Sequence, residues 1–387
     1  MKKLLSFTLF TATLLGFMSM PACNKQPTVR NINNAVVTDK KSENGIDFEI
    51  SFPEGQDIKI LQLSDMQMQE LSGARNENRK NQVGGAFFSH GIHDHEIRLW
   101  RYVDEAVARA NPDMIVLIGD NIYGELDDDG SMWLDICDKI DSFGVPWIVV
   151  FGNHDNESAK GVMWQIKQLE KTKNCVFRRG TVTGNSNYTV AVKQGDEYKY
   201  MFYMLDTNGC CVKDNPGESL MPDNKDIDKL QQTPGVYLDQ IEWMIDCHDK
   251  SSTVTGDIPA LIFMHIPPRE VYFSLKNLYP DTYNKDNPFY ADREGDSGFS
   301  YEIPWGFDNI DFYITAQEIG CTGMFMGHCH GVCTSIMYKN IRLTFGVKTG
   351  TYDYHFKDML GSTLITINES DNSFSVENLY SQLEYVG

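Results

Sequence analysis

Residues 146–155 read PWIVVFGNHD, a short apolar run that ends abruptly in a glycine, an amide, an imidazole and a carboxylate. An apolar run of this length, bounded by turn residues, is typical of a strand buried on both faces. The same layout occurs upstream in DMIVLIGDN at 113–121 and IKILQLSDMQ at 58–67. It occurs again downstream, where PALIFMH at 259–265 ends in one histidine and GMFMGHCH at 323–330 contains two.

Stretches with helical periodicity separate these runs. Apolar side chains recur at near-helical spacing between Ile97 and Ala110, which predicts a helix over 95–110, and a second helical stretch covers 132–143. Further strands are expected at 199–206, 342–348 and 362–368. Short buried strands alternating with helices indicate an α/β fold in which helices cover the faces of the sheets.

Length and charge limit the architecture and the partners. The chain has 387 residues, 41% of them hydrophobic, and a net charge of −20. This length accommodates a single domain over 46–387, in which the aromatic and acidic segment 269–309 is expected to form a substrate loop. The negative charge disfavours nucleic acid and anionic lipid surfaces as partners, because both require positive potential, and it is compatible with cations. The oligomeric state is left open.

The N-terminus has the layout of an export signal. Lys2 and Lys3 precede an apolar stretch too short to cross a bilayer, which is typical of a bacterial signal peptide over 1–22. Cys23 follows a small residue, as at a lipoprotein cleavage site, so we expect lipidation at Cys23 and a polar tether over 23–45. The protein would then be a membrane-anchored lipoprotein of the bacterial envelope, in the periplasm or at the cell surface. The alternative is ordinary signal cleavage, and the irregular spacing of the other cysteines leaves their pairing open.

Each buried run ends in residues that can bind a metal ion. In open α/β folds ligands bind where the carboxyl ends of the strands meet. Carboxylate, amide and imidazole groups suit one or two hard to borderline cations. The glycines before Asp120, Asn153 and His328 are expected to turn the backbone, so that the next side chain points into the site. The polar residues at these strand ends include Asp65, Gln67, Asp120, Asn153, His154, Asp155, His265, His328 and His330.

The ordered blocks resemble those of the calcineurin-like metallophosphoesterases, in the branch related to purple acid phosphatases. The blocks are Asp65-Met66-Gln67, Gly119-Asp120, Gly152-Asn153-His154-Asp155, His265 and Gly327-His328-Cys329-His330. The resemblance implies a two-sheet β-sandwich flanked by helices, with two metal ions at the carboxyl-terminal edge of the strands. Asp120 would bridge the ions, Asp65 and His330 would complete the first site, and Asn153, His265 and His328 the second. His154 would be the catalytic residue beside the scissile phosphate.

The first block departs from the family pattern. Most members have Asp-x-His there, and this chain has Gln67, whose neutral amide is a weak ligand. Purple acid phosphatases also lack that histidine and bind Fe(III) through a tyrosine three residues after the bridging aspartate, the position of Tyr123. Two interpretations stay open. Either Tyr123 supplies the ligand, which implies Fe(III) with a divalent Zn, Mn or Fe ion, or the first site is weak.

Four other residues are candidates for substrate contacts. His93 and His95 follow the first strand on the same edge of the sheet. The alternative for this stretch is that Asp94 caps the next helix and the histidines are solvated. Arg269 and Tyr272 come shortly after His265 and are candidates for the substrate pocket.

The function indicated by these residues and by the resemblance is hydrolysis of small phosphate esters, with monoesters favoured. A hydroxide activated by the metal pair would be the nucleophile, and the sequence contains no Gly-x-Ser-x-Gly or Walker motif that would compete. One alternative is a phosphodiesterase of the same fold. The other is a degenerate lipoprotein that binds a metal or phosphate without turnover, because Gln67 replaces the usual histidine.

Overall fold

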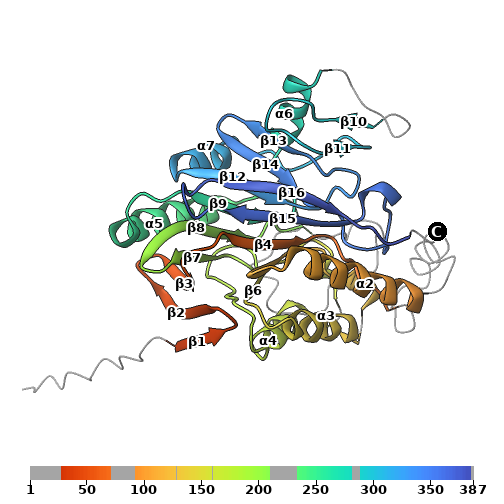
Figure 1. Ribbon diagram of the computed structural model, residues 1–387, viewed down its shortest axis with the longest axis horizontal. Helices are drawn as coiled ribbons and strands as arrows, with labels where there is room; N and C mark the ends of the chain where they lie inside the picture. The colour runs from red at the N-terminus through yellow and green to blue at the C-terminus, as the bar shows by residue number, and fades with distance from the viewer. Residues whose placement is uncertain are drawn as a thin grey trace, which may run out of the picture.

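The computed structural model describes residues 28–70, 92–127, 129–158, 160–209, 233–280 and 288–384, except for the side chains of residues 92–95. Two β-sheets pack face to face, and helices cover their outer faces (Figure 1). This arrangement confirms the predicted two-sheet α/β sandwich.

The two sheets differ in size. In spatial order the nine strands of the larger sheet are β1 (Thr28–Ile32), β2 (Ala35–Glu43), β3 (Ile46–Phe52), β7 (Tyr188–Gln194), β8 (Glu197–Leu205), β9 (Ala260–Met264), β12 (Cys321–Met326), β14 (Ile341–Phe345) and β13 (Ser335–Tyr338). The five strands of the smaller sheet are β16 (Phe374–Tyr380), β15 (Gly361–Ile367), β4 (Ile58–Leu63), β5 (Met114–Ile118) and β6 (Trp147–Val150). A separate two-stranded ribbon consists of β10 (Phe289–Tyr290) and β11 (Phe299–Ser300).

The helices divide between the two outer faces. The helices on the five-stranded sheet are α2 (Ile92–Ala110), α3 (Ser131–Ser142) and α4 (Val162–Leu169). The helices on the nine-stranded sheet are α5 (Leu238–Thr255), α6 (Glu270–Leu278) and α7 (Ile310–Glu318). Short 3₁₀ turns occupy Gly124–Leu126, Asp155–Glu157 and Lys357–Met359.

Strand β4 shows why the sequence pattern is apolar rather than alternating. Ile58 and Ile60 pack in the layer between the two sheets, whereas Leu61 and Leu63 join the cluster beneath the helices of the smaller sheet. Because successive side chains of a strand point to opposite faces, a strand covered on both sides needs apolar residues at nearly every position.

The direction of the strands brings the polar blocks together. Strands β4, β5 and β6 run parallel, so their carboxyl ends lie along one edge of the smaller sheet. In the larger sheet β9 and β12 also run parallel. The five polar blocks follow these five strand ends.

The expected tether is wrong for residues 28–43, which form β1 and β2 at the edge of the larger sheet. Ile32, Ala35 and Val37 are buried in the layer between the sheets, while much of the remaining hairpin is exposed. The polar composition therefore reflects a half-exposed edge hairpin. The signal peptide and Cys23 lie outside the described residues, and their assignment stays a prediction.

Other expectations are corrected or limited by the structure. Helix α2 begins at Ile92, so Asp94 lies inside its first turn and not at the N-cap position. Segment 269–309 contains α6, β10 and β11, so it is not a single loop. The cysteines of the described residues are all buried free thiols. In the same part of the chain, none of the helices has the length and hydropathy needed to span a bilayer.

Candidate metal centre

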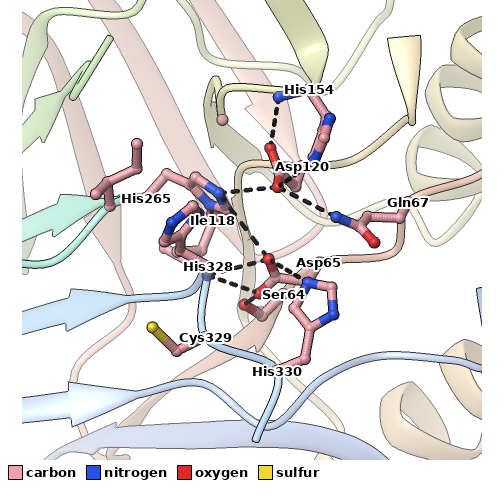
Figure 2. Close-up of polar contacts among 12 residues, drawn as sticks. Ser64, Asp65, Gln67, Ile118, Asp120, His154, His265, His328, Cys329 and His330 are labelled. Atoms are coloured by element: carbon pink, nitrogen blue, oxygen red, sulfur yellow. Dashed lines mark hydrogen bonds and ion pairs between the residues drawn. The ribbon is translucent and has the colours of Figure 1, made fainter. Parts of the chain in front are cut away.

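The polar blocks meet in one buried cluster. Asp65 follows β4, Asp120 follows β5 and Asn153 follows β6, and all are at most 5% exposed. His265 follows β9 of the opposite sheet and is fully buried. Figure 2 shows Asp120 among His265, Gln67 and His154, and Asp65 beside the backbone of His328 and the ring of His330.

The donor atoms lie close enough to share cations. Asp120 Oδ2 is 3.1 Å from His265 Nε2, and Asp65 Oδ1 is 3.4 Å from His330 Nε2. Asp65 Oδ1 and His265 Nε2 are 4.0 Å apart, which links the two pairs. One ligand atom from each of Asp120, His265 and His328 lies within 4.8 Å of the others.

Two buried polar atoms of the cluster are suited to bind a cation. His328 Nε2 and Gln67 Oε1 are buried and have no hydrogen-bond partner among the described residues. A buried polar atom without a partner costs free energy, and coordination of a metal ion would compensate that cost. The donor set therefore fits a metal centre.

The carboxyl and imidazole groups of the cluster shift one another's pKa values. Burial opposes the charge of Asp120, yet His265 and His154 hold the pKa of its carboxyl well below the usual range. Burial also opposes a charge on His265, but Asp120 raises the pKa of His265 to about 9. For His328, burial and the nearby His265 lower the pKa to about 3, so its imidazole is neutral and can donate a lone pair to a metal.

The sequence predicted that the glycines before three site residues would turn the backbone, and only one of these glycines has a left-handed conformation. Gly119 has the expected positive φ of 78°, but Gly152 and Gly327 do not. Instead, four residues of the site are themselves left-handed, namely Asp65 (φ 51°), Gln67 (49°), Asp120 (48°) and His328 (74°). Gly327 is needed for close packing, since an added Cβ would lie 2.6 Å from both Asp65 Oδ2 and Ser64 Oγ.

Residues outside the predicted set orient the ligands. His265 Nδ1 lies 2.8 Å from the carbonyl oxygen of Ile118, which directs Nε2 toward Asp120. His330 Nδ1 lies 2.8 Å from the carbonyl oxygen of Tyr354, whose ring stacks on the imidazole at 4.1 Å. Such contacts are common behind metal-binding histidines.

Lys348 is a further residue that the sequence reasoning missed. It is buried, and its Nζ donates a hydrogen bond of 2.7 Å to the backbone oxygen of Asp65. This bond holds the left-handed turn at Asp65. Lys348 carries no motif, so no pattern could have identified it. The cluster Tyr352-Asp353-Tyr354-His355, in contrast, is visible in the sequence as polar residues after the strand at 342–348.

His154 is held by a carboxylate three residues further along the chain. Its Nδ1 is 2.8 Å from Oε2 of the buried Glu157, and its Nε2 lies 4.0 Å from Asp120 Oδ2. Burial opposes a charge on this ring, but Glu157 and Asp120 raise the pKa of His154 to about 10. Glu157 was not predicted, although it lies only three residues after His154.

Asp155 has a structural role. Its carboxylate accepts hydrogen bonds from the backbone N–H groups of Gly152 (2.8 Å), Asn121 (2.9 Å) and Ile122 (3.1 Å). It therefore ties the turn after β6 to the turn after β5. Burial and the nearby charge of Asp120 together raise the pKa of Asp155 to about 7.

Gln67 and Tyr123 both lie in the cluster. Gln67 Nε2 donates a hydrogen bond of 3.2 Å to Asp120 Oδ2. Tyr123 is buried, and its ring stacks on His154 with a centroid separation of 4.1 Å. Both residues thus border Asp120 or the adjacent His154.

The residues predicted to contact substrate are not brought together in this way. Arg269 pairs with Asp308 and lies over the ring of Phe273. Tyr272 contacts the ring of Phe273 and the ammonium group of Lys276. The side chains of His93 and His95 lie outside the described residues, so those candidates stay predictions.

A pocket of about 720 Å³ lies elsewhere in the fold, between the β2–β3 hairpin, α5 and the segment that follows α4. None of the metal-centre donors lines it. Arg178, which does line it, is paired with Asp39 and Asp47. The pocket is therefore separate from the chemistry of the metal centre.

A two-sheet sandwich with buried carboxylate, amide and imidazole donors at the ends of its strands is the scaffold of a metal-dependent hydrolase. The chain belongs to the calcineurin-like phosphoesterase family, which matches residues 58–293. This family is dependent on a dinuclear metal centre.

Comparisons with individual proteins agree with this family. Two Arabidopsis thaliana relatives have the titles "Probable inactive purple acid phosphatase 29" and "Probable inactive purple acid phosphatase 14". The first is 24% identical and covers 79% of this chain and 75% of its own. The second is 26% identical and covers 77% of this chain and 71% of its own.

Two solved structures are also matched, at low sequence identity. A dimetal phosphatase from Danio rerio is 13% identical, with a TM-score of 0.43, and the match covers 84% of this chain and 99% of that one. The purple acid phosphatase PPD1 from yellow lupin (Lupinus luteus) seeds is 13% identical, with a TM-score of 0.43. That match covers 85% of this chain and 56% of the lupin chain.

Proposed function

We propose that the protein hydrolyses phosphate esters, monoesters in preference to diesters, at a dinuclear metal centre. The observation that carries this proposal is the convergence of Asp120, His265 and His328, whose ligand atoms lie within 4.8 Å of one another. These residues come from both sheets and are far apart in the sequence. Family membership supports the same reaction class.

The donors divide into two sets around Asp120. Asp65 and His330 would hold the first ion, and Asn153, His265 and His328 the second, with Asp120 shared. When bound, the ions would neutralise phosphoryl oxygens and acidify a bound water. His154 would assist the leaving oxygen through Nε2, because Nδ1 is occupied by Glu157.

We propose Tyr123 as the ligand that replaces the weak Gln67, with Fe(III) in the first site and Zn, Mn or Fe as the divalent partner. The burial of Tyr123 and its stacking on His154 support this proposal. A phenolate is a hard anionic donor that favours Fe(III). The Tyr123→Phe protein should lose iron and visible absorbance. Retention of both would reject the assignment.

The reaction can be tested on purified protein loaded with Mn, Zn or Fe. We expect faster hydrolysis of p-nitrophenyl phosphate than of its bis-ester. Asp120→Asn should lose metal and activity together, whereas His154→Ala should keep its metal and lose roughly 10²- to 10⁴-fold in kcat. A faster rate on the bis-ester would instead assign a phosphodiesterase.

A non-catalytic protein is the second candidate. Gln67 in place of a histidine favours it, as do the titles of the two relatives, which call those proteins inactive. A fully metal-loaded protein that hydrolyses neither ester would support this candidate. Gln67→His should then restore turnover if the substitution is the cause.

The proposed location is the bacterial envelope, with the chain anchored through a lipid on Cys23. The proposal rests on the sequence of residues 1–23 alone. Membrane fractionation of the full chain and of Cys23→Ser tests it. Release of the variant alone would support a lipid anchor, and equal release of both would reject it.

A further inference from the structure

Trp305 is an exposed aromatic residue at the edge of the metal centre. Its side chain is 57% exposed, although tryptophan is normally among the more buried residues. Its ring centroid lies only 4.3 Å from that of His328, at an interplanar angle of 77°. A large apolar surface therefore faces solvent next to a proposed metal ligand.

Residues on both sides of Trp305 are hydrogen-bonded to the loops that carry the histidines. Phe307 N–H donates to the carbonyl oxygen of Pro267 at 3.0 Å, just after His265. Glu302 Oε1 accepts a hydrogen bond of 2.8 Å from the N–H of Gly331, just after His330. Trp305 thus has a position fixed relative to the metal centre before any ligand binds, which lowers the entropic cost of a contact.

The charges around Trp305 do not favour a second anionic group on a substrate. Arg269, whose backbone N–H donates to the carbonyl oxygen of Phe307, is paired with Asp308. The protein as a whole carries a net charge of −20. An uncharged planar ring, in contrast, gains from stacking on an indole and pays no electrostatic penalty.

We propose that Trp305 stacks on a planar ring in the alcohol part of the substrate, so that the substrates are phosphate esters of ring-bearing alcohols such as nucleoside monophosphates. This inference rests on the proposed function, because the phosphate would bind at the metal centre. Trp305 is then a specificity-determining residue of segment 269–309, where Arg269 and Tyr272 were the expected ones.

The test compares adenosine 5′-monophosphate with ribose 5-phosphate. In both compounds the leaving oxygen is the primary oxygen on C5 of a ribose, and the compounds differ by the presence of the base. We expect wild-type protein to prefer the nucleotide in kcat/KM. Trp305→Ala should lose that preference, roughly 5- to 100-fold on the nucleotide, with little change on ribose 5-phosphate. Trp305→Phe should keep most of it.

Tyr290→Ala is the matched control, because Tyr290 is an exposed aromatic residue of the same segment, at 61% exposure. It should behave as wild type. An equal loss on both substrates in Trp305→Ala would overturn the proposal, since Trp305 would then only support His328. So would a wild-type protein with no preference for the nucleotide.

The same proteins, loaded with metal, should also be titrated with both compounds by calorimetry. A protein that hydrolyses neither, yet binds the nucleotide more tightly only when Trp305 is present, would reject the proposed hydrolysis and retain the stacking. A protein that hydrolyses both at equal rates and binds both equally would retain hydrolysis and reject the stacking.

Discussion

Four residues of the metal centre have strained backbone conformations. Asp65, Gln67, Asp120 and His328 all have left-handed backbones, which cost a non-glycine residue on the order of 1–3 kcal/mol each. Hydrogen bonds such as that from His154 N–H to Asp120 Oδ1 hold these turns in place. The residue types could be recognised in the sequence. The dihedral angles could not, because they depend on partners from distant segments.

Glu157 is a positioning residue for His154, and its removal should affect the leaving group most. Glu157→Ala frees Nδ1 of the ring, so Nε2 no longer points reliably at the substrate. We expect kcat to fall roughly 10- to 100-fold, with a larger loss on alkyl phosphates than on p-nitrophenyl phosphate, whose good leaving group needs little help. Steady-state kinetics on both substrates measure this difference.

Two controls accompany this variant. Glu197→Ala removes an exposed carboxylate and should leave all rates unchanged. Metal content should also match wild type, because the residue that Glu157 holds is His154, which is not a proposed ligand. Equal losses on both substrates would show that Glu157 acts through general stability.

Metal affinity should rise with pH because His265 must lose a proton to bind. Asp120 raises the pKa of the imidazole to about 9 in the metal-free protein. Below that pH an incoming cation displaces the proton, so the apparent affinity should increase about tenfold per pH unit between pH 6 and 8. Equilibrium dialysis at several pH values measures it, and an affinity independent of pH would contradict the assignment.

At the scale of elements, the sequence predicted the parts whose signal is local. The strands β4, β5, β6, β9 and β12 are apolar runs closed by polar residues, and this pattern reflects burial on both faces. The hairpin of β1 and β2 was missed because only part of it is buried. The hairpin is held in the sheet because β1 pairs with β2 and β2 pairs with β3. Such pairing cannot be recognised from a short stretch of sequence.

The same limit applies to the candidate site. Ligands that end predicted strands could be identified from their blocks. Lys348 could not, because it contacts Asp65 across 283 positions of sequence. The role of Trp305 could not be predicted from the sequence either. Its contact with His328 arises in the folded chain, because its loop is hydrogen-bonded to Pro267 and Gly331.

The edge hairpin can be tested by comparing two neighbouring valines of β2. Val37 is 1% exposed and Val36 is 38% exposed, on opposite faces of the strand. Val37→Ala should lower the free energy of unfolding by about 2 kcal/mol, while Val36→Ala should change it by less than about 0.5 kcal/mol. Urea unfolding followed by circular dichroism measures both. Equal effects would indicate a tether without a buried face.

At the scale of the whole molecule, the metal centre joins the two sheets. Asp65, Asp120 and Asn153 follow strands of the smaller sheet, and the three histidines proposed as ligands follow strands of the larger one. A cation bound here would be coordinated by residues from both sheets. Separation of the sheets during unfolding would therefore break coordination, and metal binding should be linked to global stability.

This linkage predicts how metal changes unfolding. A cation that binds only the folded chain stabilises it by about 2.7 kcal/mol when present at 100 times its dissociation constant. We therefore expect the urea midpoint to rise with added Mn or Zn and to fall back after chelation. His265→Ala should abolish the increase because it removes a ligand from the larger sheet, whereas His248→Ala in α5 should preserve it. If metal shifted the midpoint of His265→Ala as much as that of wild type, the stabilising cations would be bound elsewhere, and the centre would not join the sheets.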